Sequence, residues 1–493
     1  MHLKKLGMLS VGLAMVLAGC SEPAGTLPAA SKALDAPGTT SISFTGTGKW
    51  YQFGQAPVPG QAWPEFAVSA YTQTVSYSDP AAGRVEMTRL QVIDPNRARP
   101  APVEAKVDQY VVGEMAWNVA PNGTIAAQPG AVQERIVEAW ATPHGFLRSA
   151  TANKATGTPA NGGSEVSFSV GNLKLTGSIN AQNEVMRVLS QFDNPVTGDT
   201  PVEFTYSDYK DFNGVRFPGR IVRTQGGHPV LEITVASVTK NPTVAYAVPD
   251  DVKSYAAPPI NVEVEQLADG VYYLKGGSHH SILIDQADHL VIVEGPQSPA
   301  RGQAVIDKAK ELVPNKPIRY VVNTHVHFDH SGGLRPFVAE GATIVTHESA
   351  RPFYEAAWGN PRMLGPDSMS TGGKPATFET VGDKHVLTDG KRPIELHAIQ
   401  GSGHADGFLM VYLPNEKILS EADAYSPLAP DAPPPATPNP YSVNLHENIE
   451  RLGLDVAAIA PIHGRRVTMT DLRRDIGVPE PVAAKSKAKA KAK

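Results

Sequence analysis

The sequence predicts two domains in series, a mostly antiparallel β domain followed by an α/β domain. Three observations lead to this fold class. Residues 43–257 contain segments such as VSFSVGNLKLTGSI, in which apolar and polar residues alternate between turn signals. Pro258 and Pro259 then interrupt regular structure, and beyond them apolar strands alternate with helical segments. The chain of 493 residues is also too long for one core, so two domains plus terminal segments are expected.

The β-rich domain is predicted over residues 43–257. One helix is expected within it, at QPGAVQERIVEAWAT (128–142). The stretch YSDYKDFNGVRFPGRIVRTQGGHPVLEITVASV (206–238) resembles the successive strands of lipoprotein-carrier half-barrels. Because this half contains no tight cluster of histidines and carboxylates, we expect a structural or docking role for it.

The N-terminus reads MHLKKLGMLSVGLAMVLAGC, with two lysines, an apolar run and the only cysteine of the chain. This pattern predicts a lipoprotein signal peptide over residues 1–19 and a lipid on Cys20 that anchors the protein to a membrane. An ordinary signal peptide is the alternative. Ser21 resembles the residue that directs bacterial lipoproteins to the outer membrane, so we expect a cell-envelope protein facing the periplasm. Residues 20–42 are predicted to be a flexible linker.

The formal net charge is −5, which gives no reason to expect a nucleic-acid partner. Residues 471–493 form a C-terminal segment whose Lys/Ala-rich end is predicted to be disordered. A weak contact of this end with acidic lipid or cell-wall polymers is the alternative. The sequence leaves the oligomeric state open.

The α/β domain is predicted over residues 258–470. Paired strands are expected in GVYYLKGGSHHSILIDQADHLVIVEGP (270–296), and further strands in IRYVV (318–322) and GATIVTH (341–347). Helical spacing is found at 299–313, which begins with a proline, and at 442–454.

The segment NTHVHFDHSGG (323–333) ends the apolar strand IRYVV with four ligand-type side chains: His325, His327, Asp329 and His330. Imidazole and carboxylate groups suit Zn²⁺, and four of them in one loop can reach two cations. Three downstream segments each place one more such residue at an apolar strand, namely His404, Asp423 and His463. A rigid strand end can hold a ligand in place.

In this order, and with Glu294 upstream, these residues resemble the metallo-β-lactamase superfamily of hydrolases over residues 262–470. The resemblance implies an αβ/βα sandwich with the metals at one edge. It implies two Zn²⁺ ions per chain, one held by His325, His327 and His404, the other by Asp329, His330 and His463, with Asp423 bridging them. Glu294 is implied to support the ligand loop without binding metal.

The resemblance also implies a function, a dinuclear zinc-dependent hydrolase in which a metal-bridged hydroxide attacks a small-molecule ester, thioester, lactone or amide. The bridging Asp423 is more similar to glyoxalase II and lactonases than to antibiotic-hydrolysing enzymes. His327 stands where di-iron, oxygen-reducing relatives have a glutamate, which favours hydrolysis. Manganese and iron remain open as metals. The alternatives are a β-lactam-hydrolysing metallo-β-lactamase and a non-catalytic envelope protein that binds lipids or lipoproteins.

Two residues are predicted to act in catalysis. Asp329 is expected to accept the proton of the attacking water, and Tyr425, two residues after Asp423, to donate a hydrogen bond in the cleft. We expect structural roles for His279 and His280; the alternative is that they line the mouth of the cleft. The proline-dense segment 427–441 is predicted to be a stiff loop that shapes substrate access or, alternatively, a spacer.

Overall fold

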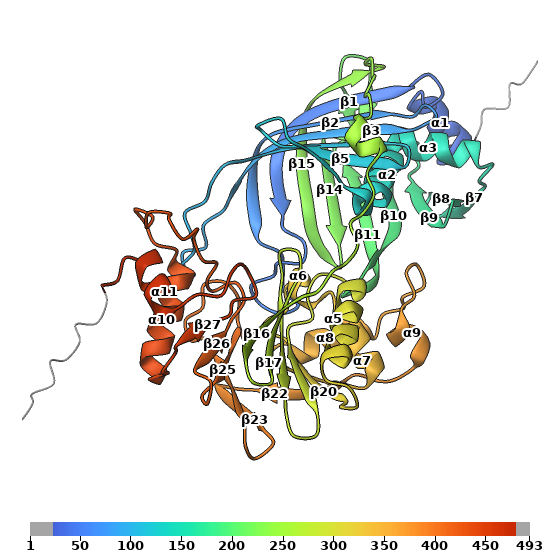
Figure 1. The fold of residues 1–493 in the computed structure, drawn as a ribbon. Helices are drawn as coiled ribbons and strands as arrows, with labels where there is room; N and C mark the ends of the chain where they lie inside the picture. Colours follow the sequence, from blue (N-terminus) through green and yellow to red (C-terminus); the bar gives the residue numbers. More distant parts are fainter. Residues whose placement is uncertain (1–22, 480–493) are drawn as a thin grey trace, which may run out of the picture.

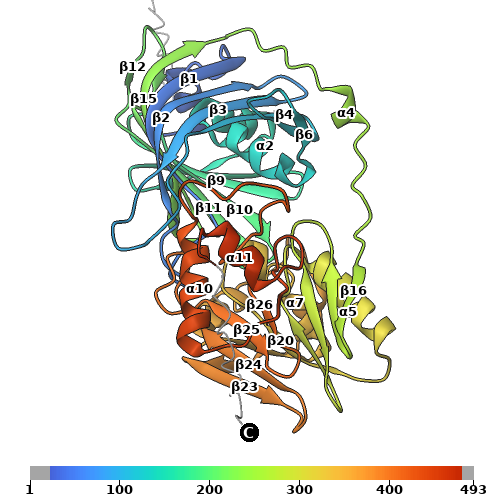
Figure 2. The same cartoon turned by 60° about the vertical axis from the view of Figure 1, so that its left-hand side comes forward.

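The computed structural model describes residues 23–479, which form two domains joined by an extended linker (Figures 1 and 2). The predicted signal peptide, Cys20 and the Lys/Ala-rich end lie outside the described residues. Within residues 23–479, none of the helices combines the length and apolar character needed to cross a membrane.

The N-terminal domain is a curved 13-stranded sheet in which every neighbouring pair is antiparallel. Its strands run in the order β6-β5-β4-β3-β2-β1-β15-β14-β11-β10-β9-β8-β7. Their bounds are β1 Ser41–Tyr51, β2 Glu65–Ser76, β3 Ala82–Gln91, β4 Ala105–Val112, β5 Met115–Val119, β6 Ile125–Ala127, β7 Gly157–Ala160, β8 Gly163–Val170, β9 Leu173–Ile179, β10 Val185–Asn194, β11 Gly198–Ser207, β14 Arg220–Gln225 and β15 His228–Lys240. A separate two-stranded ribbon consists of β12 Lys210–Asp211 and β13 Arg216–Phe217.

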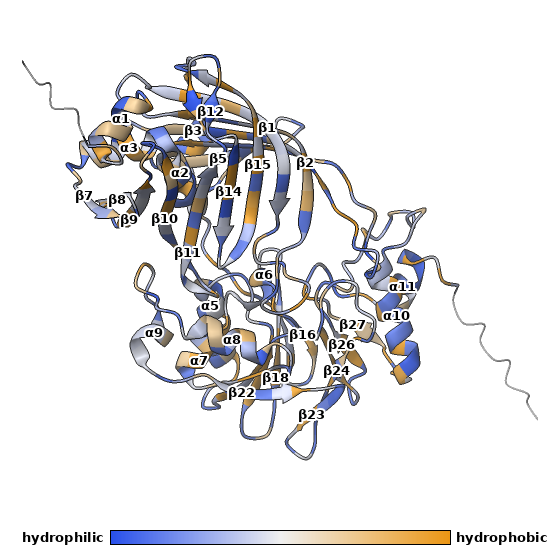
Figure 3. Ribbon diagram, turned by 180° about the vertical axis from the view of Figure 1, so that it is seen from behind, coloured by the Kyte–Doolittle hydropathy of each residue, from blue (hydrophilic) through white to orange (hydrophobic). Residues whose placement is uncertain are grey.

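Three helices lie against one face of this sheet and close its core, as Figure 2 shows for α2. They are α1 Leu27–Ala33, α2 Val132–Ala141 and α3 Pro143–Ala152, and a 3₁₀ turn at Pro129–Ala131 precedes α2. The expected helix at 128–142 is therefore present, and α3 follows it directly. Figure 3 shows hydrophobic and hydrophilic residues mixed along the strands, as the alternating sequence requires for a sheet with one buried face.

Helix α1 contradicts the predicted flexible linker over residues 20–42. Thr26 caps its N-terminus, and Leu27, Ala30 and Leu34 are buried in the core of the N-terminal domain. Strand β1 then begins at Ser41. The linker prediction is wrong for residues 27–42 because an apolar stripe at helical spacing lies within the small, polar composition.

The second domain contains two mixed sheets. The first is seven-stranded, with the strands in chain order: β16 Glu263–Ala268, β17 Val271–Lys275, β18 Ser281–Asp285, β19 Leu290–Val293, β20 Ile318–Val322, β21 Thr343–His347 and β22 Thr377–Val381. The second is five-stranded: β23 Lys384–Thr388, β24 Pro393–Ala398, β25 Leu409–Leu413, β26 Ile418–Ser420 and β27 Ala458–Ile459. The helices are α5 Pro299–Leu312, α6 Phe328–Ser331, α7 Arg335–Glu340, α8 Arg351–Trp358, α9 Ser368–Gly372, α10 Pro440–Leu452 and α11 Met469–Asp475, and α4 Asp250–Lys253 lies in the linker.

Burial shows that these elements form four layers. On β19, Leu290 and Ile292 pack towards helices α5 and α7, whereas Val291 and Val293 pack between the two sheets. Alternate residues of β25 divide in the same way between the sheet interface and a core with α10 and α11. This arrangement is the expected αβ/βα sandwich. Helix α11 extends it to Asp475, beyond the predicted end at residue 470.

The two domains are in direct contact. The end of β10 supplies Asp193, whose carboxylate receives two hydrogen bonds from Arg362 at 2.9 and 3.1 Å. Next to it, the carboxylate of Asp199 accepts the backbone N–H groups of Met363 and Leu364 at 2.8 and 3.0 Å. The hairpin between β10 and β11 therefore fixes the N-terminal domain on the loop before α9.

Candidate metal centre

The predicted ligands come from separate loops and meet at one edge of the sandwich. His325 and His327 follow β20, and Asp329 and His330 lie in the short helix α6. The other three lie beside strands of the second sheet, with His404 before β25, Asp423 after β26 and His463 after β27.

The carboxylate of Asp423 lies between two histidine pairs. Its Oδ1 is 2.8 Å from Nε2 of His463 and 3.0 Å from Nε2 of His330. Its Oδ2 is 2.9 Å from Nε2 of His404 and 3.6 Å from Nε2 of His325. Each oxygen thus faces its own group of nitrogens, as a carboxylate that bridges two cations requires.

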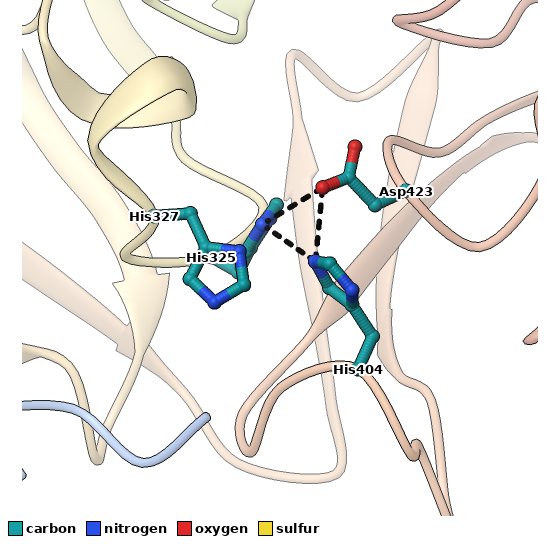
Figure 4. A group of neighbouring side chains, drawn as sticks. All are labelled: His325, His327, His404 and Asp423. Carbon is teal, nitrogen blue, oxygen red and sulfur yellow. Dashed lines mark hydrogen bonds and ion pairs between the residues drawn. The ribbon is translucent and has the colours of Figure 1, made fainter. Parts of the chain in front are cut away.

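We call His325, His327, His404 and Asp423 the first site (Figure 4). The Nε2 atoms of His325 and His404 are 3.2 Å apart. Two ligands of one Zn²⁺, each bonded at about 2.0–2.1 Å, lie about 3–3.5 Å apart in tetrahedral geometry. Nδ1 of His327 is buried and has no hydrogen-bond partner among the described residues. The donor set and this free nitrogen both fit a metal cation.

We call Asp329, His330, His463 and Asp423 the second site. The Nε2 atoms of His330 and His463 are 3.3 Å apart, again the spacing of two ligands on one cation. Oδ2 of Asp329 is 3.9 Å from Nε2 of His330. The side chain of Asp329 is 39% exposed, so it is the ligand-type group most open to solvent.

The ring nitrogens that face away from the cations are held by the surrounding protein. Nδ1 of His325 lies 3.0 Å from the Thr324 hydroxyl, and Nδ1 of His463 lies 2.9 Å from the carbonyl oxygen of Ser278. Nδ1 of His330 is 3.3 Å from Oε2 of Glu294. Such partners fix the tautomer and orientation of a metal-binding histidine.

Glu294 lies beneath the ligand loop and is fully buried. Besides His330, its carboxylate accepts the side-chain amide of Asn323 at 3.0 Å and the hydroxyl of Thr324 at 2.5 Å. It contacts His330 through Nδ1, the nitrogen opposite Asp423, and holds three residues of the loop, which fits the supporting role that the resemblance implies.

The charges of the cluster suit cations. Burial lowers the pKa of His325 to about 4, and burial and neighbouring imidazoles hold the pKa of His327 below its usual value. Both rings are therefore neutral near pH 7, the form that binds metals. Burial opposes charge on His330, but Asp423 and Glu294 raise its pKa well above the usual value. A positive charge is thus favoured between these carboxylates, and a metal cation can supply it.

The N-terminal domain reaches into this centre, which the sequence did not predict. Its loop 52–64, between β1 and β2, donates the side-chain amide of Gln55 to Oδ1 of Asp329 at 2.8 Å. The carbonyl oxygen of Ala56 lies 3.2 Å from Nε2 of His327. The ring of Phe53 packs on Phe328 with centroids 5.2 Å apart.

A second loop of the N-terminal domain, 92–104, lies against the loop of His404. Arg97 forms an ion pair with Asp406 at 2.7 Å. A Cβ on Gly403 would come within 1.8 Å of the carbonyl oxygen of Ala98, so only glycine permits this approach. The one available signal was length, since loops of this size exceed what joining two antiparallel strands requires.

The predicted catalytic role of Tyr425 is wrong. Its side chain points into the core with α10 and α11, and its hydroxyl donates to Oδ2 of Asp475 at 2.7 Å. The residue follows Asp423 in a loop rather than a strand, so a spacing of two does not direct both side chains to one face. Tyr441 lies at the site instead, with its ring 5.3 Å from that of His404.

The proline-dense segment 427–441 contains no strand among the described residues, and helix α10 begins at its end. The backbone N–H of Leu428 donates to Asp475 at 3.0 Å, which ties the start of the loop to α11. Both ends of the segment lie near the metal centre, because Ser426 lines a cavity beside His463 and Tyr441 contacts His404. That the loop shapes access stays a prediction.

A cavity of about 490 Å³ opens beside His463. Lys275, Arg465 and Arg466 line it, and Glu265 is the counter-charge, 3.5 Å from Lys275 and 3.6 Å from Arg466. A larger cavity, of about 720 Å³, lies against Trp358 and Met363 and includes none of the predicted ligands. The cavity beside His463 is therefore the candidate substrate cavity.

Residues 274–463 match the family model for the metallo-beta-lactamase superfamily. This part of the chain belongs to that superfamily, as the ligand order indicated, and membership points to a metal-dependent hydrolase or a related function.

Among curated proteins, 2,4-dinitroanisole O-demethylase subunit alpha of Nocardioides sp. (strain JS1661) is 24% identical over 170 residues, 34% of this chain and 46% of that protein. This chain therefore spans less than half the length of that relative. Similar solved structures include a metallo-beta-lactamase from Pontibacter korlensis (17% identity, 44% of this chain, 98% of that chain, TM-score 0.35). Another is the flavodiiron protein from Giardia intestinalis (19% identity, 45% of this chain, 59% of that chain, TM-score 0.34).

Proposed function

We propose that this protein is a dinuclear zinc-dependent hydrolase that cleaves an ester, thioester, lactone or amide of a small molecule. The observation that carries the proposal is Asp423, whose two carboxylate oxygens face separate histidine pairs. With two cations bound, such a centre acidifies a shared water molecule and polarises the bond to be cleaved. Histidine and carboxylate donors without cysteine fit Zn²⁺. The metal analysis should also measure manganese and iron.

The side chains of the centre divide the work. Asp329 is ionised, because the nearby imidazole of His279, the charge of His330 and the amide of Gln55 together outweigh burial and lower its pKa. Its side chain is the most exposed of the cluster, so its carboxylate can accept a proton from water in the cleft. The histidines would hold the two cations in place, and the carboxylate of Asp423 would join the first site to the second.

The cavity beside His463 supports a substrate with a negatively charged group. Lys275 and Arg466 share a single carboxylate, Glu265, so a cationic charge is left for an anion. Lys275→Ala should raise KM for a carboxylate-bearing ester and leave KM for its neutral methyl ester unchanged. An equal effect on both substrates would remove the support for an anionic substrate.

The proposal is tested by metal analysis and a substrate panel. The wild type should bind about two zinc ions per chain, and Asp423→Ala should lose both activity and part of the metal. The panel includes esters, thioesters, lactones, amides, β-lactams and, because of the curated relative's name, an aromatic methyl ether. A purified chain that binds no metal and turns over none of these substrates would contradict the proposal.

We also propose that the protein is exported and anchored in the outer membrane through a lipid on Cys20. The signal pattern before Cys20 supports this location. Cys20→Ala should move the protein from the membrane fraction to the soluble fraction of the cells that produce it. An unchanged distribution would rule out the lipid anchor.

A further inference from the structure

We propose that His279 is an additional ligand of the metal centre and binds the cation of the second site through Nε2. The inference rests on the proposed metal centre. His279 lies in the turn between β17 and β18, on a different segment from every predicted ligand. Its ring centroid is 4.1 Å from that of His463 and 4.9 Å from that of His330.

The two nitrogens of His279 have different surroundings. Nδ1 lies 2.8 Å from the hydroxyl of Ser278, which holds the ring in place. Nε2 is buried and forms no well-aligned hydrogen bond among the described residues, in a side chain that is 7% exposed; it approaches Oδ2 of Asp329, itself a predicted ligand, at 3.4 Å. A buried polar atom without a hydrogen bond is rare and requires an explanation. A cation in front of Nε2 provides one.

The spacing agrees with this explanation. Nε2 of His279 lies 3.4 Å from Oδ2 of Asp329, within the range for two ligands of one cation. The ligand atoms of His279, His330 and His463 all lie within 4.8 Å of one another. Together with Asp329 and Asp423, these histidines offer five ligand atoms to the second site, whereas the first site offers four.

Both ring nitrogens of the neighbouring histidine, His280, have hydrogen-bond partners. Nδ1 of His280 accepts the backbone N–H of Gly276 at 3.2 Å, and its Nε2 lies 2.9 Å from the carbonyl oxygen of Gly464. His280 is therefore a matched control for His279, with the same side chain one position further along.

The difference in ligand number also predicts that the second site binds its cation more tightly than the first.

The first experiment measures zinc affinity by competition with a chelator for the full chain, with His279→Ala compared with His280→Ala. His279→Ala should weaken binding of one of two zinc ions by at least about tenfold, the lower end of the effect of losing a partner of a metal site. His280→Ala should bind both ions as the wild type does. Two zinc ions bound in His279→Ala with wild-type affinity would overturn the role of His279 but leave the proposed hydrolase intact. A wild type without metal would overturn both.

The second experiment remains informative if the alanine variant folds poorly. A cysteine thiolate that binds Co²⁺ gives a charge-transfer absorption in the near ultraviolet, which free thiols do not give. The cobalt-loaded His279→Cys variant should show this absorption, and His280→Cys and the wild type should not. A cobalt-loaded His279→Cys chain without the absorption would overturn the proposal.

Discussion

Replacing Gln55 by alanine tests whether the N-terminal domain takes part in the metal centre. Gln55 belongs to the N-terminal domain, and its amide donates to Oδ1 of Asp329 at 2.8 Å. The substitution removes this donor without disturbing the backbone of the loop. We expect Asp329 to become more mobile and its Oδ2 to be less well placed for a cation.

The expected size follows from the contact. A hydrogen bond to a charged group contributes about 1.5–3 kcal/mol, and the exposure of the Asp329 side chain places this one at the lower end. A loss of about 1.4 kcal/mol corresponds to a tenfold change in affinity. Gln55→Ala should therefore weaken zinc binding at the second site about tenfold. Gln55→Glu should weaken it further, because two carboxylates would then face each other.

The assay is a zinc titration against a competing chelator, with the melting temperature of each variant as a check on folding. The control is Gln61→Ala, an exposed glutamine in the same loop with no hydrogen bond from its side chain to the metal domain. Equal zinc affinities for Gln55→Ala and Gln61→Ala would refute the inference that the N-terminal domain supports the centre.

Three further predictions concern buried side chains. Glu294→Gln should weaken zinc binding about 10–100-fold in a chelator competition, because the amide cannot accept every bond that the carboxylate does, including that of His330. Tyr425→Phe should leave kcat unchanged in a steady-state assay and cost about 1 kcal/mol in urea unfolding, since the hydroxyl contacts only Asp475 in the core. Burial lowers the pKa of His144 to about 4, so the unfolded chain takes up its proton first as the pH falls below about 6.5, and this group makes the fold roughly 2 kcal/mol less stable at pH 5 than at pH 7. His144→Leu should remove this pH dependence, and urea unfolding at the two pH values measures it.

The ligands could be found from the sequence because their signal is local and ordered. His325, His327 and His330 lie within one short segment, and each later ligand stands beside an apolar strand. The strands around them follow from apolar, buried runs such as those of β18 and β19. The same patterns gave the two-domain organisation.

The residues that the sequence did not reveal act across long separations. Gln55 and Ala56 meet Asp329 and His327 more than 250 positions along the chain. No periodicity connects these positions, because the contact depends on how two folded domains dock. His279 could not be recognised as a ligand for a different reason, since a histidine just before a strand has many ordinary structural roles. The structure distinguishes it from His280 by a buried nitrogen that forms no hydrogen bond and lies beside Asp329.

Two loops of the N-terminal domain contact the metal domain, through Gln55 and through Ala98, and these contacts decide whether the two domains can be separated. The linker after β15 looks like a natural point at which to separate the chain, and each half has its own core. A fragment that starts after the linker would nevertheless expose Phe328 and release His327 from its carbonyl partner. The two halves have separate cores, but these contacts mean that they cannot be exchanged between proteins independently. A chimera would have to bring matching loops with its N-terminal half, because the contacts of Asp329 and His327 with Gln55 and Ala56 form only when both halves have docked.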